Sequence, residues 1–362
     1  MVGAPGYPRP RNCRLDSLDP PSWRPGAVAP ASGGQMPAST TTTRSVLLVA
    51  GALLASTGVV TPAPAARADA DTSVGWLSGA SGAGVVDGDL AAWRGSPLEI
   101  AGTWADDNRS MTGLWALRPG GALDSWAGPV DIAIGALGPG ETWQQAATGA
   151  YDARWRESLT NLRTLWGERT STLYVRLAHE MNGTWYPWSV RDGDVAAFQE
   201  AWKRFRAMQQ EIVPAAQLVF SVNRESANGI DWRTTFPGAE YVDVLGTNAY
   251  NQFPYVASDA DWDAYLNGTD ATGAPRGLQQ HLDFARSVGL PLAVSEWSGN
   301  ADFGDSPAFV DNLHRWFAAN AGSGPGQVLY EVQFNVPTDN RKWLLDADSR
   351  MPAAADRYRE LW

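Results

Sequence analysis

The chain has 362 residues, of which 44% are hydrophobic and 10% aromatic, and this is ample for a globular core. Its net charge of −11 argues against nucleic acid and anionic membrane surfaces as partners. The chain contains 18 Trp. Because an indole N–H needs a hydrogen-bond partner when buried, so many tryptophans suggest ligand contacts in addition to core packing.

The N-terminal part of the sequence differs in composition from the rest. Residues 1–35 are rich in Pro, Gly and Ser, which is typical of a disordered segment or of a mis-assigned start. A second candidate start, Met36, is followed by Arg44, the apolar stretch 45–60 and an Ala-x-Ala pattern at 66–68. This order of features is typical of a secretory signal peptide.

We therefore expect a signal peptide over residues 36–68 and secretion of a mature chain, 69–362. The apolar stretch is shorter than the roughly 20 residues that span a bilayer, so we expect no membrane association after cleavage. The mature part has the size of one (β/α)₈ domain, since such barrels run to about 250 residues or more. We expect it to be a monomer.

Eight short runs rich in β-branched and aromatic residues alternate with helical or loop segments in the mature chain. The runs are 74–80, 98–104, 130–137, 173–177, 217–223, 242–248, 290–297 and 328–335. Segments between them show helical periodicity, as in 151–166 and 195–212, and Ser306-Pro307 fits an N-cap followed by a first helical residue. This alternation predicts an α/β fold, a single (β/α)₈ TIM barrel.

The stretch 172–188, TLYVRLAHEMNGTWYPW, joins the fourth of these runs to an aromatic-rich loop. We expect this strand to end in His179 and Glu180, and the C-terminal ends of barrel strands are where chemistry is placed. Aromatic faces beside a carboxylate suit a sugar, because a pyranose ring presents apolar C–H faces. A buried Glu is also often a structural ion-pair partner, here of Arg176, and this alternative stays open.

A second carboxyl, Glu296, lies near the end of the seventh run. The fourth and seventh strands of a closed barrel approach across its mouth, so Glu180 and Glu296 can face one cleft. Retaining cleavage of a glycosidic bond needs two carboxyls about 5–5.5 Å apart, one as proton donor and one as nucleophile. Further polar and aromatic residues lie at the ends of the predicted strands: Trp104, Asp106, His179, Asn182, Asn223, Asn248, Tyr250, Trp297, Gln333 and Asn335. Ordinary loop polarity can explain any one of these residues. It does not explain why so many of them occur at the same end of the strands.

The segment 176–188, RLAHEMNGTWYPW, resembles the acid/base motif of glycoside hydrolase family 26. Three further segments resemble landmarks of this family in the same order: 149–152, 237–250 and 295–297. Members of the family are clan A (β/α)₈ retaining enzymes. They are mainly endo-β-1,4-mannanases, with some mixed-linkage β-glucanases and β-1,3-xylanases. The resemblance covers about residues 74–335.

The resemblance implies particular roles for several side chains. Glu180 would be the acid/base and Glu296 the nucleophile, and Tyr250 would hydrogen-bond the nucleophile. His179 would contact the sugar or orient Glu180. Two tryptophans of the motif, Trp185 and Trp188, would line the subsites.

Two positions depart from the family pattern: Asn248 stands where the family tends to have Asp, and Phe334-Asn335 where it often has Trp. These changes bear on mannan specificity more than on hydrolysis. The implied function is a secreted retaining endo-β-glycosidase that hydrolyses a β-linked polysaccharide, foremost β-1,4-mannan. The alternatives are a mixed-linkage β-glucanase or exopolysaccharide hydrolase of the same fold, and a carbohydrate-binding barrel without activity.

Rival functions find less support in the sequence. The H-E-x-x-H zinc motif fails at Gly183, and with only three histidines in the chain we expect no metal and no cofactor. Residues 79–83, GASGA, are not the G-x-S-x-G elbow of a serine hydrolase. A barrel that only binds carbohydrate would need neither Glu180 nor Glu296, so the presence of both favours an enzyme.

Overall fold

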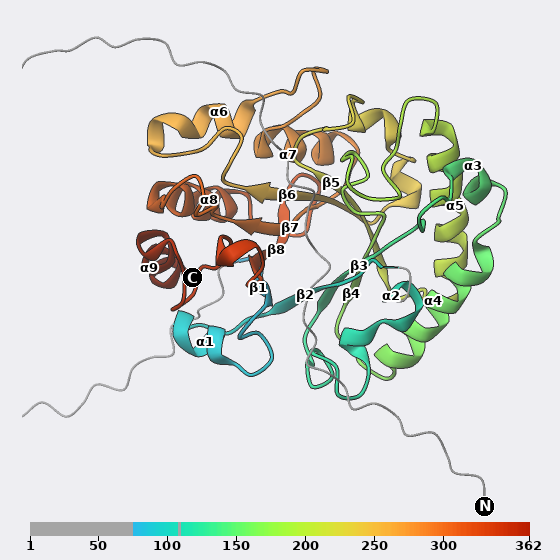
Figure 1. Cartoon of the computed structure of the whole chain (residues 1–362), viewed down its shortest axis with the longest axis horizontal. Coiled ribbons are helices and arrows are strands. Elements are labelled where there is room, and N and C mark those ends of the chain that lie inside the picture. Colours follow the sequence, from blue (N-terminus) through green and yellow to red (C-terminus); the bar gives the residue numbers. More distant parts are fainter. Residues whose placement is uncertain (1–74, 108–109) are drawn as a thin grey trace, which may run out of the picture. The chain divides into compact units, whose positions relative to one another are not determined.

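The computed structural model describes residues 75–107 and 110–362 of the chain (Figure 1). The segment 1–35 and the signal peptide expected over 36–68 lie outside the described residues. Within the described part, no helix is long and apolar enough to cross a membrane.

Eight parallel strands close into one barrel in sequential order, and β1 completes the circle by pairing with β8. The (β/α)₈ prediction is therefore confirmed. The strands are β1 (Leu77–Gly82), β2 (Ile100–Ala105), β3 (Val130–Ile134), β4 (Leu173–Leu177), β5 (Gln217–Asn223), β6 (Val244–Tyr250), β7 (Leu292–Ser298) and β8 (Val328–Asn335). The sequence predicted β5 and β8 to the residue, whereas the other strands differ by up to three residues at an end, including β4, which ends at Leu177 and not at Glu180.

Helices surround the barrel and cover its outer face. They are α1 (Asp89–Arg94), α2 (Ser110–Gly113), α3 (Trp143–Ala147), α4 (Asp152–Trp166), α5 (Val195–Ile212), α6 (Trp262–Asn267), α7 (Leu278–Ser287), α8 (Pro307–Asn320) and α9 (Pro352–Leu361). Short 3₁₀ turns are η1 (Trp115–Leu117), η2 (Trp232–Thr235), η3 (Ala239–Tyr241), η4 (Asp259–Asp261) and η5 (Asp339–Arg341). The expected cap is present, since the Ser306 side chain accepts a hydrogen bond from the Phe309 N–H at 3.1 Å.

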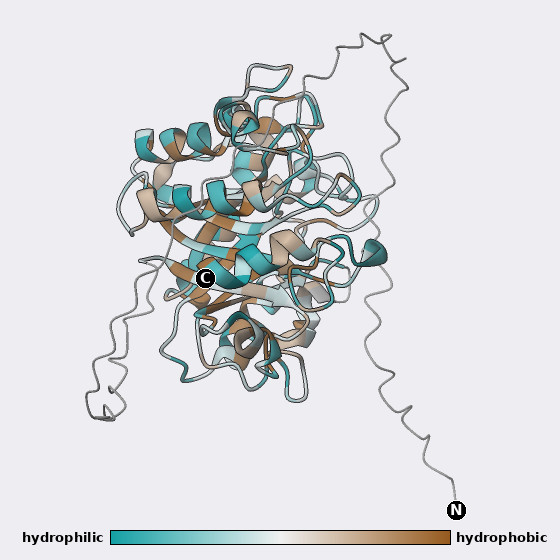
Figure 2. Cartoon of the chain, turned by 90° about the vertical axis from the view of Figure 1, so that its left-hand side faces the viewer, coloured by the Kyte–Doolittle hydropathy of each residue, from teal (hydrophilic) through white to brown (hydrophobic). Residues whose placement is uncertain are grey.

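Alternate residues of most strands belong to two different apolar clusters, as the pleat requires. One cluster lines the barrel interior and includes Ile100, Tyr174, Val219, Tyr330 and Val332. The other lies between the strands and the helices and is much larger. Figure 2 shows hydrophobic residues concentrated on the strands, with hydrophilic residues frequent on the surrounding helices. This alternation decides which strand residues can reach the mouth of the barrel.

The alternation is broken in β7, close to its C-terminal end. Thr247 of β6 pairs with Val294, but the next residue, Asn248, pairs with Glu296, so Ser295 is an extra residue in β7. The pairing of β7 with β8 shifts over the same residues. A β-bulge of this kind re-aims the side chains that follow it. Glu296 therefore faces the inside of the barrel, and Trp297 faces the helices.

Candidate active site

The backbone changes direction sharply where β4 ends. Ala178 and Glu180 both have left-handed backbone angles, with φ of 51° and 53°. This conformation is costly for residues with a side chain and persists only where the surroundings hold it. Here the Glu180 N–H donates to the Ser221 carbonyl at 3.0 Å, and the Glu180 carbonyl accepts from Gly183 N–H at 2.8 Å. The turn directs the Glu180 side chain across the mouth of the barrel.

Asn182 fastens this turn to the end of β5. Its side-chain amide donates to the Asn223 carbonyl and accepts from the Asn223 N–H, both at 2.8 Å. Because both polar ends of the buried amide are occupied by backbone, the prediction that Asn182 contacts substrate is wrong. Asn223 itself is half-buried at the mouth of the barrel, and its expected contact with substrate stays a prediction.

Two donors hold the carboxyl group of Glu180. Asn248 Nδ2 donates to Oε1 at 2.7 Å, and Trp185 Nε1 donates to Oε2 at 3.0 Å. Gly183 permits the second contact, because a Cβ there would come within 2.5 Å of the Trp185 ring. Burial, and then the charge of Glu296, raise the pKa of Glu180 to about 7, while the two donors lower it. A carboxyl with this pKa is largely protonated at mildly acidic pH and can donate a proton.

Glu296 lies in a different electrostatic environment. Arg176 donates to its Oε1 at 2.7 Å, Trp104 Nε1 donates to Oε1 at 2.9 Å, and the Tyr250 hydroxyl donates to Oε2 at 2.9 Å. The expected contact from Tyr250 is thus present. Burial and then the charge of Glu296 raise the pKa of Tyr250 well above its usual value, so its hydroxyl stays a donor. Three donors, one of them a buried cation, thus hold the Glu296 carboxyl group in place.

Arg176 is the centre of a buried charge network inside the barrel. Its Nε donates to Asp131 Oδ1 at 2.5 Å, and Asp131 Oδ2 also accepts from the Tyr330 hydroxyl at 2.8 Å. Burial opposes the charge of Arg176, but Asp131 and Glu296 raise its pKa. The alternative that Glu180 is the ion-pair partner of Arg176 is therefore wrong, because Arg176 pairs with Asp131 and Glu296.

His179 is enclosed by aromatic rings of the β4 loop. Its ring lies 4.8 Å from Tyr186 and 5.6 Å from Trp188, and its Nε2 is 3.0 Å from the Tyr186 hydroxyl. Burial, and then the charge of Arg176, lower the pKa of His179 well below its usual value. His179 is therefore neutral, and its contact with substrate stays a prediction.

Trp188 is part of the loop core. It is 1% exposed, stacks on Tyr186 with ring centres 4.4 Å apart, and donates through Nε1 to the His179 carbonyl at 2.8 Å. The prediction that Trp188 lines a subsite is wrong because neighbouring rings cover it. Trp185 is half-buried beside Glu180, and its role in a subsite stays a prediction.

Trp297 and Gln333 do not face the mouth of the barrel, so the prediction that they contact substrate is wrong. The bulge in β7 turns Trp297 outward, where it stacks on Trp362 at 5.2 Å and donates to the buried carboxylate of Glu331. Gln333 lies one residue away from the inward-facing Val332 in β8, is fully buried, and its amide lies 3.4 Å from the Trp343 carbonyl. Asn335 is likewise buried in contacts with Ala83 and Asp346.

Aromatic rings surround the nucleophile candidate. Trp104 and Phe334 point inward from β2 and β8, with ring centres 5.3 Å apart in an edge-on arrangement. Trp343, from the segment after β8, lies 4.6 Å from the Tyr250 ring and 6.3 Å from Phe334. Sequence reasoning did not include Trp343, Asp131 or Arg176 among the site residues. Asp131 could have been singled out from the sequence, because it is a charged residue inside the otherwise apolar run 130–134.

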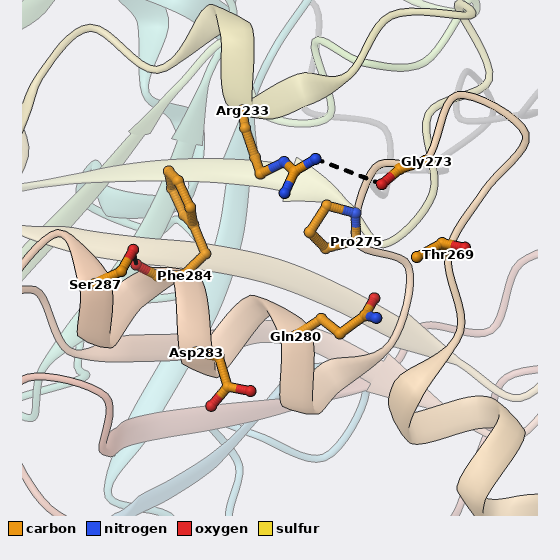
Figure 3. A pocket seen from close by; sticks show the side chains of 8 residues that line it. All are labelled: Arg233, Thr269, Gly273, Pro275, Gln280, Asp283, Phe284 and Ser287. Carbon is orange, nitrogen blue, oxygen red and sulfur yellow. Dashed lines mark hydrogen bonds between the residues drawn. The ribbon is translucent and has the colours of Figure 1, made fainter.

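Other features of the described residues do not form a competing site. No group of three or more His, Cys, Asp or Glu among them could hold a metal ion. A surface pocket lies on the flank of the barrel between η2, the segment 269–275 and α7 (Figure 3). Its one carboxyl, Asp283, is half-exposed and paired with Arg286 at 2.7 Å. The pocket is lined by Arg233, Thr269, Gly273, Pro275, Gln280, Asp283, Phe284 and Ser287.

The fold and the site define a class of (β/α)₈ barrel proteins in which two glutamates, at the ends of β4 and β7, share one buried site. Residues 154–273 match the model of Glycosyl hydrolase family 26. The match includes Glu180 and the segment through β6. Over these residues the resemblance to glycoside hydrolase family 26 seen in the sequence is confirmed.

Two curated relatives have related sequences. Endoglucanase H from Acetivibrio thermocellus is 25% identical over 202 residues, which are 52% of this chain and 20% of that protein. A mannan endo-1,4-beta-mannosidase from Bacillus subtilis is 33% identical over 97 residues, which are 25% of this chain and 26% of that protein. The matched part thus spans about a quarter or less of the length of these relatives.

Solved structures share the fold at low sequence identity. A modular endo-beta-1,4-mannanase from Cellulomonas fimi has a TM-score of 0.54 and 16% identity, with coverage of 79% of this chain and 70% of that one. GH26C from Muricauda sp. has a TM-score of 0.53 and 12% identity, with coverage of 79% and 85%. At this level of identity the likeness shows the barrel fold alone.

Proposed function

We propose that the protein is a retaining endo-β-glycosidase in which Glu180 is the general acid/base and Glu296 the nucleophile. The observation that carries this proposal is the contrast between the two carboxyls. Glu180 has a pKa raised to about 7 and two neutral donors, whereas Glu296 accepts from a buried guanidinium and two further donors. Two carboxyls with such different hydrogen-bond partners can divide the acid and nucleophile roles.

The first step would cleave the glycosidic bond. Glu180 gives its proton to the oxygen that links the two sugars, and the Glu296 carboxylate attacks the anomeric carbon as that bond breaks. The product is a covalent glycosyl ester on Glu296, and the charge network has lost the negative charge that Arg176 and Tyr250 stabilised. The loss of the Glu296 charge also lowers the pKa of Glu180, because that charge is one of the causes that raise it.

The second step would release the sugar. Glu180, now ionised and with a lower pKa, takes a proton from water, and the water oxygen attacks the anomeric carbon. The bond to Glu296 breaks and its carboxylate returns to Arg176, Trp104 and Tyr250. Two inversions at the same carbon give net retention of configuration.

We propose β-1,4-mannan as the substrate. Two curated proteins named mannan endo-1,4-beta-mannosidase match this chain over 97 and 133 residues, and they support this choice. A β-glucan is the second candidate, because the match to Endoglucanase H extends over 202 residues. Phe334 stands where a Trp is expected on strand eight, and Trp343 lies beside it. This difference within the site bears on the choice between mannan and β-glucan.

We also propose that the protein is secreted, on the basis of the sequence features over 36–68. N-terminal sequencing of protein from the culture medium should give a chain that begins near Asp69. A first residue upstream of Met36 would contradict this proposal.

A substrate screen tests the proposed activity. Purified protein would be incubated with β-mannan, mixed-linkage β-glucan, carboxymethyl cellulose, xylan and a bacterial exopolysaccharide, and reducing ends would be measured. We expect release of oligosaccharides from mannan, and its loss in Glu180→Gln and Glu296→Gln. Protein that is folded by circular dichroism but cleaves none of these polymers would contradict the proposal and favour a non-catalytic barrel.

A further inference from the structure

Asp106 is a buried carboxyl group that the two-glutamate mechanism does not use. It follows directly after β2 and comes two residues after Trp104, so both side chains leave the chain on the inner side of the barrel mouth. Its side chain is 10% exposed. Its Oδ2 is buried and has no hydrogen-bond partner among the residues that the structure describes.

The nearest candidate partner of Asp106 is too far away to satisfy this oxygen. His179 Nε2 lies 3.8 Å from Oδ2, beyond the range of a hydrogen bond, and is already 3.0 Å from the Tyr186 hydroxyl. His179 is also neutral, so no ion pair forms. Asp106 Oδ2 therefore keeps an unused acceptor site.

The position of Asp106 is beside the reacting groups. The charges of Glu296 and Arg176 both act on it, and its own charge acts on Tyr186. Trp104, on the same strand, donates to Glu296. A sugar ring held between Glu180 and Glu296 would therefore have a hydroxyl within reach of this wall of the site.

A buried, unsatisfied carboxylate oxygen is costly, and such groups are expected where a ligand completes their hydrogen bonding. We propose that Asp106 is a specificity-determining residue whose free Oδ2 accepts a hydrogen bond from a hydroxyl of the sugar bound at the catalytic glutamates. This inference rests on the proposed function and adds to it a third carboxyl, which binds substrate and takes no part in bond cleavage.

The ionisation of Asp106 gives this role a pH signature. Burial, with smaller contributions from Glu296 and Asp107, raises the pKa of Asp106 to about 6, and a hydrogen bond from its own backbone N–H, and then Arg176, oppose the rise. Only the ionised oxygen is a full acceptor, so substrate affinity should increase as the pH rises through about 6. The other charged or titratable groups that face Asp106 are Asp107, Arg176, His179, Tyr186 and Glu296.

Binding can be measured without turnover in a Glu180→Gln background, which also removes the titration of Glu180. Mannotetraose and cellotetraose are the probes, and isothermal titration calorimetry gives the dissociation constant. We expect Asp106→Asn and Asp106→Ala to weaken binding of whichever tetrasaccharide binds by about 10- to 100-fold, as for a hydrogen bond to a charged group. Asp356→Asn, which removes a charge on the exposed side of α9, is the matched control and should leave binding unchanged.

The same titrations at pH 5 and pH 7.5 separate substrate contact from a structural role. With Asp106 present, binding should be tighter at pH 7.5, and this difference should disappear in both Asp106 variants. Unchanged affinity in the variants, or a pH difference that survives them, would overturn the role of Asp106 alone. If neither tetrasaccharide binds the protein with Asp106 intact, the proposed function and this inference both fall.

Discussion

Asn248 offers a direct test of how the site sets the pKa of its acid. The Asn248 amide donates to Glu180 Oε1 at 2.7 Å and lowers the pKa of Glu180, against burial and the charge of Glu296, which raise it to about 7. A general acid must be protonated, so the rate on a polysaccharide should fall as the pH rises through about 7. In Asn248→Ala the ionised carboxylate loses a donor, the pKa rises, and this decline should move to higher pH.

The size of the shift follows from the strength of the contact. A hydrogen bond to a charged group contributes about 1.5–3 kcal/mol, and one pKa unit corresponds to about 1.4 kcal/mol. Water can replace part of the lost contact because Glu180 is half-buried, and Trp185 still donates to Oε2. We therefore expect a shift of about one unit, at the low end of that range.

The assay is the pH dependence of kcat on the preferred polysaccharide between pH 4 and pH 9. Trp185→Phe removes the other donor and should shift the decline in the same direction. Asp356→Asn, which changes an exposed residue of α9, is the control and should leave the decline in place. A decline that stays in place in Asn248→Ala, or moves to lower pH, would refute this account of the Glu180 environment.

The remaining predictions concern stability. Arg176→Met leaves two buried carboxylates, Asp131 and Glu296, without their cation, and should lower the free energy of unfolding by about 3–5 kcal/mol in urea titrations. Arg156→Met, which removes an exposed ion pair with Glu211, is the control. A smaller loss of stability in Arg176→Met than in Arg156→Met would contradict this prediction. Trp188→Ala should lose about 3–5 kcal/mol because its ring is fully buried, whereas Trp185→Ala should keep most of the stability and lose activity. Equal melting temperatures for these two variants would show that the burial assigned to Trp188 is wrong.

The strands and the two glutamates could be predicted because their signals are local. Apolar runs of strand length, separated by helical periodicity, define the barrel, and polar residues at the strand ends indicate its active face. The family motif at 176–188 added the roles of Glu180 and Glu296. The structure confirms the barrel and places both glutamates in one electrostatically coupled site.

The substrate-contact predictions that failed depended on non-local structure. A single extra residue in β7, Ser295, reverses the direction of Trp297, and sequence alternation alone cannot show where a bulge will lie. Trp188 and Trp185 differ by three positions in one loop, yet one is buried by Tyr186 and the other reaches Glu180. Trp343 contacts Tyr250 only because the segment after β8 folds back over the barrel mouth.

The roles of the two glutamates are tested most directly with an activated aryl β-mannobioside and azide. A leaving group that departs as a stable anion needs no proton, so Glu180→Ala should still form the glycosyl-enzyme and then stall for lack of a base. Azide needs no base, and proton NMR should show turnover restored with a β-glycosyl azide as product. Glu296→Ala should be inactive on this substrate, with azide giving at most the α-azide. A β-azide from Glu296→Ala together with an α-azide from Glu180→Ala would contradict the proposed mechanism. Full activity in either variant without azide would also contradict it.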